Sequence, residues 1–249
     1  MNSAALAPHL FRLFAGLIVM IPAYAVLHRD GVLPFAPDAE GLGVIITLMG
    51  SIYAVIFAFV IFVIWGQFTE VETLTARECS SLDDLLRFAQ SLHPDSNRAI
   101  RRAVAEYAQR VANSEWHSLG EQHRDQPTEK AFDAVVSAAI RTAAMNPSEE
   151  PILQRVIDIA RKCGEQRDER VSRSLTRIPL TLLALVRLIA VSLLLLVFLY
   201  PFHTIAPGML SFALLAAILF LSNLVMTDTD NPFDGIFNVR AQPFLELTR

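Results

Sequence analysis

One stretch of the chain has no charged side chain and is longer than a helix needs to cross a membrane. It extends from Gly41 to Thr69 and consists mainly of Val, Ile, Leu, Phe and small residues. A helix of about 20 such residues crosses about 30 Å of hydrocarbon, because each residue adds about 1.5 Å. We therefore predict a transmembrane helix here, and the rest of the fold has to be arranged around it.

Two further spans are predicted near the C-terminus. Between Leu188 and Asp228 the only ionisable side chain is His203, and two prolines at 201 and 207 break the run. This pattern predicts a hairpin of helices at 178–200 and 209–226. A first candidate at 9–27 is weaker, because its uncharged part is short and it spans a membrane only if Arg12 snorkels to the interface.

The first segment has a second interpretation as a secretory signal, since a basic start and an apolar core precede the small residues Ala23 and Ala25. Retention gives four spans with both termini on the side of the middle domain, whereas cleavage leaves three. Lys and Arg residues cluster at 161–177, before the third span. The positive-inside rule places that side in the cytoplasm.

The middle of the chain has apolar side chains at helical spacing and no strand pattern. We expect helices over about 68–92, 96–120, 128–146 and 148–177, with Asp95 or Ser96 as the cap of the second. An unbroken run of the fourth through Arg177 into the membrane is compatible with the pattern. The resulting domains are a first transmembrane pair (1–66), a cytoplasmic helical domain (67–177), a second transmembrane pair (178–226) and a cytoplasmic tail (227–249).

Composition and motifs exclude several function classes. Apolar residues make up 53% and charged residues 18%, which is typical of a membrane protein, and the net charge of -4 argues against nucleic-acid partners. Cys79 and Cys163 belong to no Cys/His cluster, so we expect free thiols, no metal site and no cofactor. The motifs of phosphate loops, serine hydrolases and zinc proteases are missing, so no catalytic residue is assigned and no enzyme is expected.

Arg187 is the one charge well inside a predicted span, about 13 Å from its cytoplasmic end at about 1.5 Å per residue. Two interpretations stay open. Arg187 faces an interior and marks an ion route, or it snorkels to a lipid headgroup. In the tail, Asp228, Asp230 and Asp234 have suitable chemistry for a cation, but their spacing matches no standard loop and a solvated helix exit explains them equally.

The second span carries Leu48, Ile52 and Ile56 at four-residue steps on one face. If several copies surround an axis, such a stripe forms stacked hydrophobic rings that gate a pore by dewetting. Ordinary packing within a bundle explains the stripe as well, because every face of this helix is apolar.

The organisation of the chain resembles the bestrophin channels, and more closely the bacterial bestrophin-like proteins of unknown function. The resemblance depends on four short motifs. They are Asn231, Pro232, Phe233 and Gly235 in the tail, Pro243-Phe244 after them, residues 65–68 at the end of the second span, and the pair Glu115-Trp116. Asp234 displaces the tail glycine, and no acidic run follows. The calcium site of animal bestrophins is therefore not expected here.

The resemblance implies an all-α membrane protein with four transmembrane helices and a cytoplasmic helical domain inserted between the second and third. It implies a passive, homo-oligomeric and pentameric ion channel of the bacterial inner membrane, whose partners are its own copies, the bilayer and permeant ions. The middle domain and both termini are then cytoplasmic.

The family's pores have a neck of three apolar residues on the second helix, and counting back from Trp65 places it on Leu48, Ile52 and Ile56. The fallback register, one residue further along, is Met49, Tyr53 and Phe57. Two other functions stay open: a non-conducting, membrane-anchored scaffold or sensor that recruits a cytosolic partner, and a transporter, for which the expected hydropathy repeats are not visible.

Overall fold

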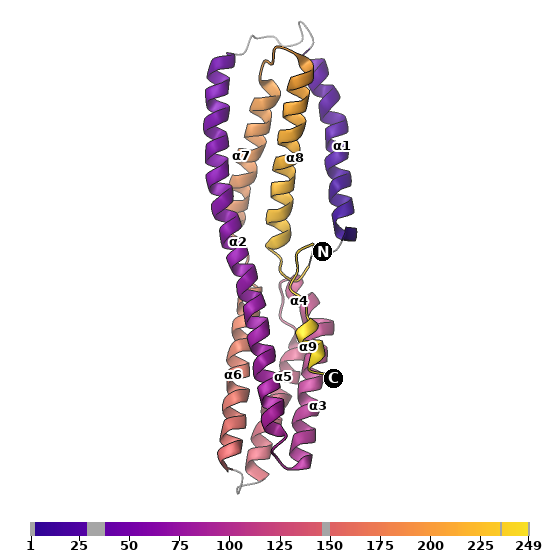
Figure 1. Cartoon of the computed structure of the whole chain (residues 1–249), viewed down its shortest axis with the longest axis vertical. Coiled ribbons are helices and arrows are strands. Elements are labelled where there is room, and N and C mark those ends of the chain that lie inside the picture. The colour runs from indigo at the N-terminus through magenta and orange to yellow at the C-terminus, as the bar shows by residue number, and fades with distance from the viewer. Residues whose placement is uncertain (1–2, 29–37, 146–149, 235, 249) are drawn as a thin grey trace. The chain divides into compact units, whose positions relative to one another are not determined.

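The computed structural model describes residues 3–28, 38–145, 150–234 and 236–248, and all regular structure in these ranges is helical (Figure 1). The helices are α1 (Ser3–Leu27), α2 (Ala39–Ala89), α3 (Pro94–Arg110), the π-helical turn η1 (Val111–Glu115), α4 (Trp116–Gly120), α5 (Gln126–Met145), α6 (Glu150–Ser174), α7 (Leu180–Leu199), α8 (Ile205–Thr229) and α9 (Gln242–Glu246).

The chain forms two compact units. The first comprises residues 1–65, 177–230 and 235–237 and is called the membrane unit below. The second comprises residues 66–176, 231–234 and 238–249 and is called the helix-bundle unit. The 51-residue helix α2 contributes to both units.

Three of the described helices, α2, α7 and α8, are long and apolar enough to cross a membrane. Helix α1 contains a shorter apolar stretch, Phe11–Leu27. The first of the four expected spans therefore stays a prediction.

The core of the membrane unit lies between α2, α7 and α8. Tyr53, Val60 and Ile64 of α2 pack against buried side chains of the two other helices, such as Val186 of α7 and Leu219 of α8. A row of apolar residues at helical spacing explains this face, because each helix must bury one stripe against a neighbour.

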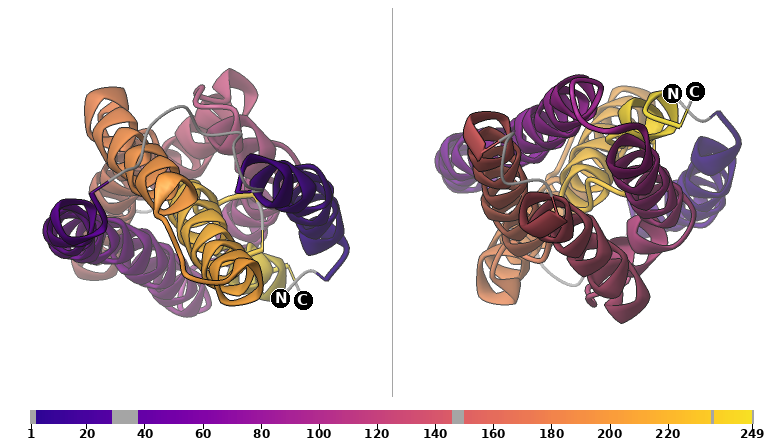
Figure 2. Two further views of the ribbon diagram at one scale, coloured as in Figure 1. Left: turned by 90° about the horizontal axis from the view of Figure 1, so that it is seen from above. Right: turned by 90° about the horizontal axis from the view of Figure 1, so that it is seen from below.

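Helix α1 packs against α8 (Figure 2). Its Tyr24 is fully buried, with its ring 5.8 Å from Phe212 of α8 and 5.7 Å from Phe198 of α7. A Cβ at Gly208 would lie 2.1 Å from the Tyr24 hydroxyl oxygen. The close approach of α1 to the first turn of α8 therefore requires a glycine.

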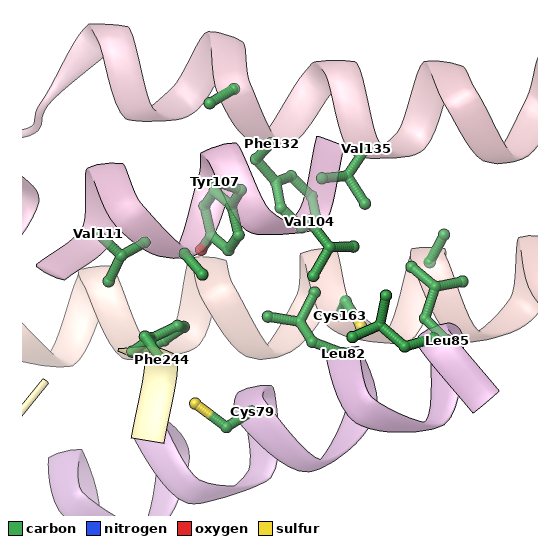
Figure 3. Close-up of a cluster of buried hydrophobic side chains, with 14 of the residues drawn as sticks. Cys79, Leu82, Leu85, Val104, Tyr107, Val111, Phe132, Val135, Cys163 and Phe244 are labelled. Carbon is green, nitrogen blue, oxygen red and sulfur yellow. The ribbon is translucent and has the colours of Figure 1, made fainter. Parts of the chain in front are cut away.

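The helix-bundle unit has a continuous core built by α2, α3, α5 and α6, which Figure 3 shows in part. Tyr107 of α3 and Phe132 of α5 meet edge to face, with their ring centres 5.2 Å apart. Cys79 and Cys163 are buried in this core as free thiols. Burial raises the pKa of Cys163 to about 12 and also raises the pKa of Cys79, so both thiols stay protonated at neutral pH.

Two helix ends differ from the prediction. The N-cap of α3 is His93, whose side chain accepts a hydrogen bond from the Asp95 amide at 3.5 Å, so the predicted cap at Asp95 or Ser96 is wrong. Pro94 suits the first helical position that follows. Helix α6 ends at Ser174, so it does not run unbroken through Arg177. Further along, Pro179 disfavours a helical conformation at Ile178, so α6 and α7 do not form one continuous helix.

Candidate functional site

The predicted neck residues lie on an uncovered face of α2. Leu48 is 60% exposed and Ile52 is 40% exposed, although both are large and apolar. Ile56 is half-buried and packs against the core of the membrane unit. Two of the three predicted neck side chains therefore point away from the other helices of the chain.

The fallback register lies on the opposite, packed side of the same helix. Tyr53 is only 8% exposed, and Met49 and Phe57 are half-buried against the core. The rings of Tyr53 and Phe57 stack with their centres 5.7 Å apart. These side chains hold α2 against α7 and α8.

The uncovered face extends further along α2 than the predicted neck. In an α-helix each four-residue step turns a side chain by about 40°, so a series of such steps leaves its face after two or three of them. This drift carries Ile56 towards the core. The face instead continues through Val55, Phe59 and Phe62, all of which are exposed. We call the set Leu48, Ile52, Val55, Phe59 and Phe62 the open face of α2.

Arg187 of α7 is anchored to α8. Its Nε donates to the Asn223 Oδ1 at 2.9 Å, and its Nη2 donates to the Thr227 Oγ1 at 3.2 Å. The Thr227 hydroxyl donates in turn to the Asn223 carbonyl at 2.8 Å. These two partners, an amide and a hydroxyl four residues apart on the next helix, were not predicted from the sequence.

The tail motif docks on the helix-bundle unit. Asn231 Nδ2 donates to the Gly120 carbonyl at 3.2 Å, and the Phe233 ring meets Trp116 edge to face at 5.1 Å. The Val239 amide donates to the Pro232 carbonyl at 2.7 Å, which folds the tail back on itself. Gly235, the last residue of the motif, lies outside the described residues.

Trp116 joins the tail to the core of this unit. Its indole Nε1 donates to the Val239 carbonyl at 2.8 Å, and its ring also meets Phe244 of α9 with the ring centres 5.8 Å apart. Phe244 is fully buried. Trp116 thus contacts Phe233, Val239 and Phe244 of the tail.

A buried group of charges lies beside these aromatic rings. Arg170 Nε donates to Glu78 Oε2 at 2.6 Å and its Nη2 donates to Glu115 Oε2 at 2.7 Å. Arg167 Nη2 donates to Glu115 Oε1 at 2.6 Å, and the Tyr107 hydroxyl donates to Glu78. We call Glu78, Tyr107, Glu115, Arg167 and Arg170 the charge cluster. Its two cations and two anions balance, as burial requires.

The surroundings of the charge cluster fix its protonation. Burial alone lowers the pKa of Arg170, but Glu78 and Glu115 outweigh this effect and the net pKa is raised well above its usual value. Burial and Glu78 raise the pKa of Tyr107, so its hydroxyl remains a donor. Phe244 and Trp116 cover the guanidinium of Arg170 at 5.4 and 5.5 Å. The cluster is a structural element that ties α2, α3, η1, α6 and α9 together.

Two acidic residues of the tail, Asp228 and Asp230, accept hydrogen bonds from backbone amides. Asp228 accepts hydrogen bonds from the Ile236 and Phe237 amides at 2.8 and 2.9 Å. Asp230 accepts from the Ile178 amide at 3.1 Å. Within the described residues, no group of three or more His, Cys, Asp or Glu side chains is placed to hold a metal ion.

A family model described as a Bestrophin-like domain matches residues 14–244. The chain belongs to the Bestrophin-like family. Among solved structures, a bacterial bestrophin homolog from Klebsiella pneumoniae has a TM-score of 0.69 at 14% identity, over 96% of this chain and 98% of that chain. A structure described as a membrane protein has a TM-score of 0.71 at 14% identity, over 96% of this chain and 97% of that chain. No curated protein matches the chain.

These comparisons establish that this Bestrophin-like chain is an all-helical membrane protein with the bestrophin fold. The resemblance to the family seen in the tail and in Glu115-Trp116 is confirmed. The likeness in fold does not extend to an activity, because the identities are low.

Sequence reasoning missed the charge cluster in this Bestrophin-like chain, although a signal for it exists. Glu78 follows Val71 and Leu74 at the spacing of the buried stripe of α2, and Arg167 and Arg170 follow Cys163 at the same spacing on α6. A charged residue in an apolar register is buried only when it is paired. These residues together predict a buried ion pair between the two helices.

Proposed function

We propose that this Bestrophin-like chain forms a pentameric ion channel of the bacterial inner membrane, with the open face of α2 along an axial pore. Leu48, Ile52 and Ile56 form the neck, which passes ions passively when it is hydrated. Residues 67–177 and both termini are on the cytoplasmic side. Family membership supports conduction and assembly, since bestrophins are channels.

The observation that carries the proposal is the exposure of Leu48 and Ile52 on a helix whose other side is packed. Large apolar side chains on a contiguous face mark a surface that is covered in the functional state by lipid or by protein. An axis surrounded by copies of α2 brings this face of each copy towards the others. Rings of Leu and Ile then narrow the pore and gate it by dewetting.

The same observation favours the neck register over the fallback. Tyr53 and Phe57 are needed to pack α2 against α7 and α8, and they cannot face an axis without leaving that core. Ile56 lies at the edge of the open face. We therefore expect Ile52 to have a stronger effect on conduction than Ile56.

An ion route past Arg187 would lie on the packed side of α2 and not along its open face. Arg187 shares a cavity with Tyr53, which is on the packed side of α2. An axial pore on the open face does not contact it directly. A selectivity change in Arg187→Gln channels would support an ion-route role there.

The proposal is tested by measuring ionic current through the purified chain in a planar bilayer under a KCl gradient. Ile52→Ala/Ile56→Ala shortens two rings of the neck, and we expect a raised single-channel conductance or open fraction. The matched control is Met49→Ala/Phe57→Ala, which removes similar side chains from the packed side of the same helix. This control is expected to leave the unit conductance unchanged.

The oligomeric state is measured in the same preparation by light scattering. The proposal predicts a particle with five times the 27.6 kDa chain mass. Currents that respond to the control variant and not to the neck variant would contradict the register. Silence in every variant together with a monomer or dimer would contradict the channel and favour the membrane-anchored scaffold.

A further inference from the structure

The membrane unit contains a cavity of about 390 Å³ on the side away from the open face of α2. Residues of α1, α7 and α8 form its walls, and Tyr53 of α2 also lines it. Its lining is almost entirely apolar, with Leu13, Gly16 and Leu17 on α1 and Phe212 and Leu219 on α8 as examples. All of the residues that line the cavity belong to the membrane unit.

Besides the Tyr53 hydroxyl, the polar groups that line the cavity are Arg12 of α1, Arg187 of α7 and Asn223 of α8. Arg187 and Asn223 are hydrogen-bonded, Asn223 is the last lining residue of α8, and Arg12 is the first of α1. On α8 the lining then extends from Asn223 to Phe212, which corresponds to about 16 Å along the helix at about 1.5 Å per residue. The cavity is thus an apolar trough with two cations at its end.

No carboxylate of the described residues forms an ion pair with either cation. Among the described residues that line the cavity, none is acidic. Arg187 is held by neutral groups, the Asn223 amide oxygen and the Thr227 hydroxyl, which fix its guanidinium. The nearby carboxylate of Asp228 is occupied by the Ile236 and Phe237 amides. A guanidinium placed in a membrane without a counter-charge is unfavourable, so the site calls for an anion.

We propose that this cavity binds an anionic phospholipid, with its phosphate on Arg187 and Arg12 and an acyl chain in the trough. A guanidinium binds a phosphate through paired N–H donors, and an apolar trough accepts a hydrocarbon chain. A free phosphate would use the cations but leave the trough unfilled. The proposal does not depend on whether the chain conducts ions.

The test is native mass spectrometry of the full chain released from detergent micelles that contain equal amounts of phosphatidylglycerol and phosphatidylcholine. The wild type is expected to retain phosphatidylglycerol in preference to phosphatidylcholine. We expect Arg12→Gln/Arg187→Gln to lower phosphatidylglycerol retention by about tenfold, because the variant loses charged hydrogen bonds to the phosphate. The control Arg177→Gln removes an arginine outside the cavity and is expected to change the retention less than about twofold.

A second variant tests the trough without changing the charge. Gly16 lines the cavity and has no atom within 4 Å of the position of an added Cβ, so Gly16→Leu fills the trough from α1. We expect Gly16→Leu to reduce phosphatidylglycerol retention while its gel-filtration profile stays that of the wild type. If Arg12→Gln/Arg187→Gln does not fold, Arg12→Gln alone replaces it as the test of the charge. Arg12 makes no hydrogen bond or ion pair with the described residues, so its loss should not affect folding.

Three results would overturn the proposal. Equal retention of both lipids by the wild type would remove the preference for an anion. Full retention by Gly16→Leu, with displacement of the lipid by excess inorganic phosphate, would indicate a site for a soluble anion. Loss of the oligomer in Gly16→Leu, with lipid retention equal in wild type and Arg12→Gln/Arg187→Gln, would indicate that a second copy fills the cavity.

Discussion

Both units have an apolar core, but the membrane unit exposes large apolar side chains whereas the helix-bundle unit buries charged ones. In the membrane unit, large apolar residues such as Leu48 and Phe62 are exposed on the outside. In the helix-bundle unit, the fully buried side chains include Arg170 and Glu78. The first pattern suits a surface that meets lipid or other copies. The second joins the helices of an apolar bundle through one buried group of charges.

The difference shows which surfaces are already covered within one chain and which are not. The charge cluster balances its own charges, and Trp116 and the tail residue Phe244 cover Arg170, so the cluster is enclosed within one chain. The open face of α2 and the Arg187 cavity are incomplete within one chain. Function is therefore expected in the membrane unit, and folding specificity in the helix-bundle unit.

Removing the central cation should have the largest effect on stability. Arg170→Leu leaves Glu78 and Glu115 buried without a cation on that side, and breaking a buried pair in this way costs about 3–5 kcal/mol. The measurement is urea unfolding of the full chain in detergent, followed by Trp116 fluorescence in a Trp65→Phe background. The control is Arg173→Leu on the same helix, whose pair with Glu70 at 3.2 Å is half-exposed and is expected to contribute less than about 1 kcal/mol.

The two faces of α2 should respond differently to the same truncation. Ile64 is 1% exposed, so Ile64→Ala leaves a cavity and is expected to lower the free energy of unfolding by about 2–4 kcal/mol. Ile52→Ala on the open face should lower it by less than about 1 kcal/mol in the detergent-solubilised chain. Thermal unfolding monitored by circular dichroism measures both. Equal losses would remove the distinction between the faces.

The contact of α1 with α8 should depend on one glycine. Gly208→Ala brings a Cβ to 2.1 Å from the Tyr24 hydroxyl oxygen, and the overpacking is expected to cost about 1–3 kcal/mol. Gly50→Ala on α2 is the control, because no atom lies within 4 Å of its new Cβ and alanine favours a helix by about 0.5–1 kcal/mol. The melting temperature should fall in the first variant and stay level or rise in the second.

The native thiols should have the smallest effect. Because burial raises the pKa of Cys163 from 9.0 to about 12, any stabilisation from the protonated thiol is complete below pH 9 and is lost only as the pH rises towards 12. Stability should therefore not depend on thiol ionisation between pH 6 and 8, and a thiol reagent such as Ellman's should react with neither Cys79 nor Cys163 in the folded chain. Ser80→Cys, an exposed neighbour on α2, is the reactive control.

The helices were predictable because their signals are local. The uncharged run of α2 and the proline break between α7 and α8 depend only on residues close together in the chain. The end of α6 was less clear, since basic residues suit both a helix end and a helix that enters a membrane. Here Pro179 decides the outcome.

The partners of the charged residues were not predictable in the same way. Glu78 and Arg170 are 92 positions apart in the sequence and form an ion pair between α2 and α6. Arg187 is hydrogen-bonded to Asn223 on the next helix. Periodicity shows that such residues lie on a buried or membrane face, but it does not say what they contact. The resemblance to the family supplied the neck role of Leu48, Ile52 and Ile56, which helical spacing alone left undecided between a pore lining and ordinary packing.

The most direct test of the account asks which face of α2 meets the ion path. Ile52→Cys and Met49→Cys place a thiol on the open and packed sides, and cationic and anionic methanethiosulfonate reagents are applied while current is recorded in a planar bilayer. We predict that Ile52→Cys currents change irreversibly, while Met49→Cys and wild-type currents do not, because the native thiols are buried. A change in Met49→Cys currents with Ile52→Cys unaffected would contradict a pore along the open face.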